Sequence, residues 1–334
     1  MATVLAIETS CDETAVAIVK NRHVMSSIVS SQIAIHRQYG GVVPEVASRQ
    51  HVETVNQAIA QSLTDAKLDW SNVDAIAATC APGLVGALLV GLTAAKTLAL
   101  VHQKPLIGVH HLEGHIYASY LTDPTLEPPF LCLLVSGGHT SLIYVKECGV
   151  YEILGQTRDD AAGEAFDKSA RLMGLPYPGG VTIDKLAREG HGNPQAIPLP
   201  RAQMGPDSLD FSFSGLKTAV LNARSNPAYT SVGLPDWAAS VQEAIVDALV
   251  TKTIRAAKMQ GVSHVLLAGG VAANSRLQAA MREVCDRAGL RLTVPSARLC
   301  TDNAAMIACA GHYHWQAGQV DGLDLDTLAS ERLA

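Results

Sequence analysis

The chain has 334 residues, of which 48% are hydrophobic and 17% charged, and it carries a net charge of −6. This composition excludes a disordered, collagen-like or coiled-coil protein, and the length allows two lobes, since single cores stop growing near ~250 to 300 residues. Lys and Arg number 25 against 31 Asp and Glu, which excludes a freestanding nucleic-acid binder with a general basic field. Any RNA contact must therefore be local or shared with a partner.

Two β-branched runs open the chain, Val4–Ile7 and Ala15–Val19, with the polar turn ETSCDET between them. The same order returns later as Phe130–Val135, the turn SGGHT and Ser141–Val145. This recurrence predicts two lobes built alike, each starting with a β-hairpin whose turn faces a common cleft. A chance resemblance between two hairpins is the alternative.

Helices and strands alternate along the rest of the chain, which predicts a layered α/β fold. The Pro-rich run DPTLEPPF predicts a boundary, with an N-terminal lobe over 1–128 and a C-terminal lobe over 129–303. The last helix, about 304–334, is expected to pack back on the first lobe, and the acidic tail from Ala317 to be peripheral. Helices are expected over 44–65, 84–101, 110–121, 160–173, 181–188, 241–259, after Asn274 and over 301–315, and strands over 73–79, 106–109 and 265–268.

No feature of the sequence indicates export or a membrane. The seven cysteines are scattered without a C-x-x-C pair, which argues against a zinc ribbon or a disulfide framework. The start MATVLAIETS does not resemble a signal peptide, so we expect a cytoplasmic protein. The apolar stretch 83–101 is broken by Gly86, Gly91 and Lys96, so we interpret it as a buried helix and expect no membrane association.

The sharpest local signal is His111-Leu-Glu-Gly-His115. Side chains four residues apart lie roughly 40° from each other on one helix face, so both imidazoles can reach one metal ion. Asp302 is a candidate third ligand, although it could instead cap a helix, and the His pair could be an ordinary polar packing pair. Glu113 lies about 200° around the helix from each His, so it cannot be the base of an H-E-x-x-H metalloprotease.

Three glycine-containing segments suggest an anion or nucleotide site. Paired glycines in Ser136-Gly-Gly-His-Thr140 let backbone N–H groups approach a phosphate, and a plain tight turn is the alternative. The junction Gly269-Gly-Val-Ala-Ala-Asn274 could admit a ribose or base, or only pack a strand tightly against a helix that Asn274 caps. Asp167 and Asp184, beside the expected YPGG turn at 177–180, could bind sugar hydroxyls or merely be solvated.

Nine motifs in matching order, from Val4 to about Ala310, resemble the TsaD family of tRNA adenosine threonylcarbamoyltransferases. They are IETSCDETAVAIV, GGVVPEVASRQH, APGLVGALLVG, HHLEGH, LVSGGHTSLI, DDAAGEAFDK, YPGG, DFSFSGLKTA and LAGGVAANSRL. The resemblance implies a two-lobed actin and Hsp70-like ATPase fold. It also implies transfer of a threonylcarbamoyl group from threonylcarbamoyl-AMP to the N6 amine of the adenosine 3′ of the anticodon, in tRNAs that read codons beginning with A.

The resemblance also assigns residues to the site. It implies one divalent metal per subunit, iron or zinc, with His139 beside it, an acidic pair facing the cleft, and a substrate-binding turn. The metal ligands would be His111, His115 and Asp302; the acidic pair Asp12 and Glu13; the turn Leu134, Val135, Ser136, Gly137 and Gly138; and the adenylate-binding residues Asp167, Gly180, Asp184 and Asn274. Glu13 is the candidate proton acceptor, and direct transfer to the leaving phosphate is the alternative.

The superfamily's usual Asp-x-Gly in the first turn is replaced here by Glu8-Thr-Ser10, which argues against ordinary ATP hydrolysis and leaves ATP or ADP binding open. The expected partners are tRNA, a TsaB-like paralogue docking on the helix over 44–65, a TsaE-like P-loop ATPase, and a TsaC-type enzyme that supplies the donor. A local patch for tRNA could come from Arg276, Arg282, Arg287, Arg291 and Arg298, unless these form a solvated helix face. A metal-dependent glycoprotein endopeptidase and a non-catalytic actin-like scaffold are the competing functions.

Overall fold

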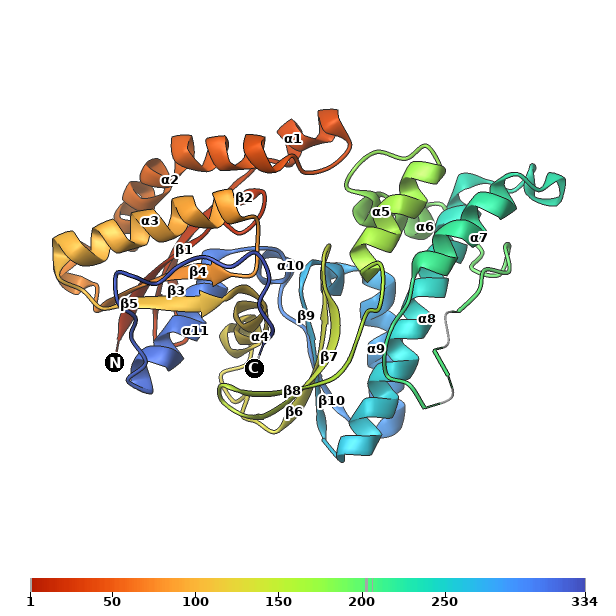
Figure 1. The fold of residues 1–334 in the computed structure, drawn as a ribbon. Helices are drawn as coiled ribbons and strands as arrows, with labels where there is room; N and C mark the ends of the chain where they lie inside the picture. Colours follow the sequence, from red (N-terminus) through yellow and green to blue (C-terminus); the bar gives the residue numbers. More distant parts are fainter. Residues whose placement is uncertain (1, 202–203, 206, 334) are drawn as a thin grey trace. The chain divides into compact units, whose positions relative to one another are not determined.

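The computed structural model describes residues 2–201, 204–205 and 207–333, which form two compact units (Figure 1). Unit 1 comprises Met1–Leu126 with Pro295–Ala334, and unit 2 comprises Glu127–Val294. The chain thus returns to unit 1 at Pro295, earlier than the residue 304 expected from the sequence. Each unit contains a five-stranded sheet.

The two sheets share one topology. Unit 1 has the strand order β3-β2-β1-β4-β5, and unit 2 has β8-β7-β6-β9-β10. In each sheet the first three strands are antiparallel, and the fourth and fifth run parallel to the first. The recurrent hairpin is therefore a repeated architecture and no coincidence. The strands are β1 Thr3–Glu8, β2 Glu13–Lys20, β3 His23–Ser31, β4 Ala75–Ala81, β5 Leu106–His110, β6 Phe130–Val135, β7 Thr140–Glu147, β8 Val150–Gln156, β9 His264–Ala268 and β10 Arg291–Thr293.

Helices cover both faces of the first sheet (Figure 1). Helices α2 and α3 lie on one face, where Leu5 and Ile7 of β1 pack with Val55 and Leu92. Helix α11 lies on the other face, where Gly311 allows close approach, since a Cβ there would stand 2.8 Å from the Cβ of Ala77. Because both faces are covered, β1 is buried along its whole length, as its apolar run predicts. The helices of unit 1 are α1 Ile33–His36, α2 Pro44–Ala66, α3 Val85–His102, α4 His111–Thr122, α10 Ala297–Cys300 and α11 Ala304–Gln316.

Helices α8 and α9 pack on the sheet of unit 2, and α5 and α6 pack on α8. The expected turn YPGG is wrong at its glycines, because Gly179 and Gly180 already form the first turn of α6, with Pro178 as N-cap. The sequence also missed α7 and the strands β3, β8 and β10, which carry more exposed and polar residues than their neighbours. The helices of unit 2 are α5 Ala162–Leu172, α6 Gly179–Glu189, α7 Ser214–Arg224, α8 Leu234–Gln260 and α9 Ser275–Ala288.

Two expectations about unit 1 need correction. Helix α3 is long and apolar enough to span a membrane by length and composition, but only one face is buried, and Leu89 and Leu100 are exposed. The C-terminal tail is bound along the sheet edge rather than peripheral. Gly108 N donates to the carboxylate of Asp321 at 2.7 Å, and Leu328 N donates to the carbonyl of Cys80 at 3.0 Å.

Gly269 and Gly270 have different surroundings, although the sequence motif suggested one shared role for both. Gly269 has a φ of +86°, and a Cβ there would stand 2.4 Å from the carbonyl oxygen of Val135, so its backbone conformation and the close approach of β6 explain this glycine. A Cβ on Gly270 would meet nothing within 4 Å.

We predict that Gly269→Ala lowers the free energy of unfolding by about 1–3 kcal/mol, because the substitution adds both backbone strain and a clash with main chain. The matched control Gly270→Ala is expected to stay within about 0.5 kcal/mol of the parent. Urea unfolding followed by circular dichroism measures both. Equal effects at the two positions would contradict this explanation.

Candidate active site

Helix α4 places His111 and His115 on one face, and both side chains are buried. Their rings meet edge to face with centroids 4.7 Å apart. The Nε2 atoms of His111 and His115 lie 3.6 and 3.2 Å from Oδ1 of Asp302. The structure thus brings the three predicted metal ligands together, with one ligand atom from each within 4.8 Å of the others.

Asp302 does not cap α11, which removes the main alternative for this residue. Asn303 is the N-cap, and its Oδ1 accepts the hydrogen bond from Met306 N at 3.0 Å. The Oδ1 atom of Asp302 instead faces the Nε2 atoms of the two imidazoles.

The ring nitrogens of His115 test whether a metal ion fits here. Its buried Nδ1 has no hydrogen-bond partner among the described residues, whereas its buried Nε2, which makes no hydrogen bond, lies 3.2 Å from Oδ1 of Asp302. A buried, unpaired ring nitrogen is unfavourable unless something binds it. Two imidazoles and one carboxylate are ligands that suit zinc or iron, with coordination positions left open. The donor set therefore fits a divalent transition metal.

Glu8, at the end of β1, contacts the same cluster, and sequence reasoning assigned it no role in the metal site. Its Oε2 lies 3.1 Å from Nδ1 of His111, and its side chain is fully buried. Burial favours the neutral ring, but the carboxylates of Glu8 and Asp302 outweigh it and raise the pKa of His111 to about 9. The sequence signal that could have identified Glu8 is its place as an acidic residue directly after the apolar run Val4–Ile7.

Glu113 lies between the two histidines in sequence but is occupied elsewhere. Its Oε2 lies 2.9 Å from Nε2 of His314 on α11. The prediction that Glu113 turns away from the metal ligands agrees with this pairing, so it is not placed to activate a metal-bound water.

Asp12 and Glu13 lie where β2 begins, in the turn after β1. Two contacts to backbone carbonyls hold this turn. Gln32 N donates to the carbonyl of Asp12 at 3.0 Å, and the side-chain Nε2 of His51 lies 3.0 Å from the carbonyl of Cys11. Burial, together with the neighbouring Asp12, raises the pKa of Glu13 to about 9.

In unit 2 the substrate-turn residues Leu134 and Val135 end β6, and Ser136, Gly137 and Gly138 follow. The turn is closed by two hydrogen bonds: Ser136 N donates to the His139 carbonyl at 2.8 Å, and His139 N donates to Oγ of Ser136 at 3.1 Å. A Cβ on Gly137 or Gly138 would meet nothing within 4 Å, so the backbone is open on that side. The place of His139 beside a metal stays a prediction.

The four predicted adenylate residues also lie in unit 2, but three of them already have structural partners. Oδ1 of Asp167 accepts from Gly179 N at 2.7 Å, at the start of the helix that contains Gly180. Oδ1 of Asp184 accepts from Oγ of Ser275 at 2.7 Å. Asn274 caps α9 through Leu277 N, which confirms its alternative role, while its Nδ2 donates to Gln242.

A cavity of about 250 Å³ lies beside Asp184 and Asn274. Gln242 and Ser275, their hydrogen-bond partners, line it together with Gly192 and Arg276. Binding of the adenylate by these residues stays a prediction.

The arginines predicted to attract tRNA are partly neutralised. Arg276 forms two hydrogen bonds to the carboxylate of Glu243, at 2.6 and 2.7 Å. Arg287 lies 3.4 Å from Glu283 one turn away on α9. These pairings favour the alternative of a solvated helix face.

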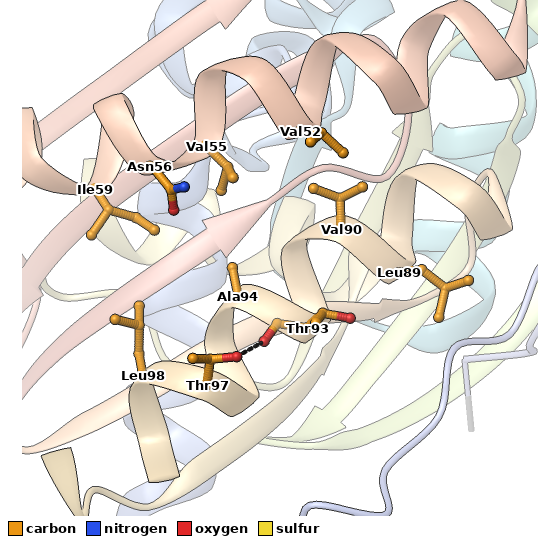
Figure 2. Close-up of a pocket in the computed structure, with 10 residues that line it drawn as sticks. All are labelled: Val52, Val55, Asn56, Ile59, Leu89, Val90, Thr93, Ala94, Thr97 and Leu98. Atoms are coloured by element: carbon orange, nitrogen blue, oxygen red, sulfur yellow. Dashed lines mark hydrogen bonds between the residues drawn. The ribbon is translucent and has the colours of Figure 1, made fainter. Parts of the chain in front are cut away.

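An apolar groove of about 480 Å³ runs between α2 and α3 (Figure 2). Val52 and Val55 of α2 point toward Val90 of α3, with Leu89 at the rim. Val52 is 62% exposed and Leu89 is 44% exposed. Such contiguous apolar exposure is typical of a protein–protein contact.

Comparison with solved structures shows the fold. Component A of the (R)-2-hydroxyglutaryl-CoA dehydratase of Acidaminococcus fermentans superposes with a TM-score of 0.56 at 15% identity, covering 94% of this chain and 98% of that one. HypF of T. kodakarensis superposes with a TM-score of 0.63 at 16% identity, covering 97% and 49%. These are actin-like ATPase folds, so the predicted fold class is confirmed.

Sequence comparison shows the family. The model described as "TsaD: tRNA N6-adenosine threonylcarbamoyltransferase" matches residues 23–309. A tRNA N6-adenosine threonylcarbamoyltransferase of Nostoc sp. (strain PCC 7120 / SAG 25.82 / UTEX 2576) is 61% identical over 332 residues, covering 97% of this chain and 95% of that relative. One of Thermosynechococcus vestitus (strain NIES-2133 / IAM M-273 / BP-1) is 58% identical over 341 residues, covering 100% and 96%. The chain therefore belongs to the TsaD family of tRNA N6-adenosine threonylcarbamoyltransferases.

Proposed function

We propose that this chain transfers the threonylcarbamoyl group from threonylcarbamoyl-AMP to the N6 amine of the adenosine 3′ of the anticodon, in tRNAs that read codons beginning with A. The observation that carries the proposal is the convergence of the buried His111 and His115 on the partly buried Asp302, in a chain that is 61% identical over 332 residues to a relative of that activity.

The donor dictates what the protein has to do. Threonylcarbamoyl-AMP is a mixed carbamoyl–phosphoric anhydride and is already activated. The N6 amine attacks the carbamoyl carbon, the bond from that carbon to the phosphate oxygen breaks, and AMP leaves with the electron pair. The amine loses one proton. The protein therefore needs to position the two reactants, stabilise negative charge and direct that proton.

We assign these tasks to residues as follows. The open backbone of Ser136, Gly137 and Gly138 would hold the phosphate, and the cavity beside Asp184 and Asn274 the adenosine. His111, His115 and Asp302 would hold one iron or zinc ion, which when bound supplies a Lewis acid for the threonylcarbamoyl oxygens. Glu13 would accept the proton, since a raised pKa makes its carboxylate a stronger base than an exposed one; direct transfer to the phosphate is the alternative.

The two competing functions have less support. A metallopeptidase needs a base beside the bound water, and Glu113 is paired with His314 instead. A non-catalytic scaffold has no need for two buried imidazoles that converge on one carboxylate.

The transfer reaction is tested with purified protein, threonylcarbamoyl-AMP, the helper subunits and unmodified tRNA. We expect the modified nucleoside in the digested tRNA, and a rate at least about 100-fold lower for Glu13→Ala, the usual contribution of a general base. Mass spectrometry of the nucleosides measures both.

The surface variant His23→Ala serves as the control, because His23 is exposed at the start of β3. Intact donor without product in the parent protein would refute the proposed function. A full rate in Glu13→Ala would assign the proton to the leaving phosphate.

The metal site is tested by binding alone. We expect the parent protein to retain about one zinc or iron ion per chain after dialysis, and His115→Ala or Asp302→Ala to retain close to none, because each removes one of three ligands. Elemental analysis of anaerobically purified protein measures this, with His23→Ala again as control. Equal metal content in all four proteins would contradict the assignment.

We further propose that this chain works in the cytoplasm with a TsaB-like paralogue, a TsaE-like P-loop ATPase and a TsaC-type enzyme that makes the donor. The apolar groove between α2 and α3 would dock the paralogue. A paralogue of the same fold can present a matching pair of helices, so that four apolar helix faces are buried together. Burying Val52 and Leu89 would remove exposed apolar surface from water.

We predict that Leu89→Lys lowers affinity for the paralogue by at least about tenfold, because it places a charge in the groove. Leu100→Lys is the matched control, since Leu100 lies on the same helix, is 64% exposed and does not line the groove. Titration calorimetry with the purified paralogue measures both. A similar loss of affinity in both variants, or no loss in either, would place the interface elsewhere.

A further inference from the structure

We propose that Glu8 is a positioning residue for the metal site, which orients the ring of His111 so that Nε2, and not Nδ1, faces the ion. This inference rests on the proposed metal site and adds a residue to it. Glu8 acts through the ring of His111, which its carboxylate contacts.

The two nitrogens of His111 face two different carboxylates. Nδ1 lies 3.1 Å from Oε2 of Glu8 and 3.2 Å from the hydroxyl oxygen of Ser10, and Nε2 lies 3.6 Å from Oδ1 of Asp302. A carboxylate only accepts hydrogen bonds, so Nδ1 must carry a hydrogen to bond with Glu8. Nε2 is then the nitrogen whose lone pair can bind a metal. Metal-binding histidines commonly have such a carboxylate on the other nitrogen.

Glu8 is itself held rigidly, which a positioning role requires. Its Oε1 accepts from the backbone N–H of Ser10 at 2.5 Å, and its Oε2 accepts from Oγ1 of Thr79 at 2.5 Å. With His111 this gives three donors to one fully buried carboxylate.

The sheet explains why these groups meet. Strands β1, β4 and β5 are adjacent and parallel, so their carboxyl ends lie at one edge. Glu8 ends β1, Thr79 lies near the end of β4, and β5 runs directly into the helix that begins with His111. The orientation of the His111 ring therefore depends on side chains at the carboxyl ends of the buried strands β1 and β4.

His115 has no comparable support, because its Nδ1 is buried without a partner among the described residues. Of the two histidines, only His111 therefore has its other nitrogen bonded to a carboxylate. We infer that the orientation supplied by Glu8 makes His111 the better-fixed ligand.

Glu8→Gln is the informative substitution. Ser10 N–H still requires an oxygen, so the amide NH₂ group would turn toward Nδ1 of His111. That nitrogen would then have to accept, which moves the ring hydrogen to Nε2 and blocks the ligand atom.

The chain offers a matched control in Glu113→Gln. Glu113 is also a buried carboxylate paired with a histidine ring nitrogen, at 2.9 Å, but its partner His314 is not among the converging ligands. Both variants exchange the same groups in the same kind of environment, so a loss confined to Glu8→Gln reports on the metal site and not on stability.

The experiment measures zinc affinity of the full-length apoprotein by competition with a chromophoric chelator, and the absorption spectrum of the Co²⁺-loaded protein. We expect Glu8→Gln to bind zinc about 10- to 100-fold more weakly with an altered Co²⁺ spectrum, and Glu113→Gln to stay within about threefold of the parent. Should Glu8→Gln not fold, Glu8→Asp, which keeps the charge but withdraws it by one methylene, is expected to show the same loss.

Unchanged zinc affinity in Glu8→Gln, or in Glu8→Asp where that variant replaces it, would overturn the inference alone and leave the metal site standing. Equal weakening in both Gln variants would overturn it as well, because the effect would then be structural. A parent protein that binds no zinc, cobalt or iron would overturn the metal site and the inference together.

Discussion

The close approach of α4 to α11 is the contact on which the site depends. Gly114 makes it possible, since a Cβ at this position would stand 2.6 Å from Cδ1 of Ile307 and 3.2 Å from Cγ of Met306. The two helices thereby bring His111 and His115 to the loop residue Asp302, which lies just before α11. A bulkier residue between the histidines would separate the helices and the ligands together.

Two buried carboxylate–histidine pairs lie around this contact, and their chemistry is the same. Glu8 pairs with His111, and Glu113 pairs with His314. Only the first pair includes a ring that also faces Asp302. The two pairs differ in where the second nitrogen of each ring points, which residue type and burial alone do not specify.

Unit 2 shows how the same sheet topology serves a different purpose. The turn after β6 corresponds in position to the turn after β1, and it carries glycines instead of acids. Gly163 and Gly269 pack against its backbone, while Gly137 and Gly138 leave the opposite side open. A rigid turn with exposed backbone suits anion binding, whereas the first turn, with Glu8, Asp12 and Glu13, carries negative charge.

Much of the fold could be predicted because its signals are local. The two hairpins, the helix beginning at Pro44 and the spacing of His111 and His115 follow from patterns of period two or 3.6, and the motifs identified the family. The sequence by itself also determined that Glu113 turns away from the two histidines, since helix geometry alone requires it.

The tertiary structure decided what depends on residues distant in the chain. It assigned the cap of α11 to Asn303 and placed Asp302 against the two imidazoles. It also placed Glu8 against His111, made Gly179 and Gly180 part of a helix, and bound the tail to β5. Local patterns cannot distinguish these outcomes, because neighbouring Asp and Asn residues are equally good caps. Only packing between strands and helices far apart in sequence determines which polar side chain finds which partner.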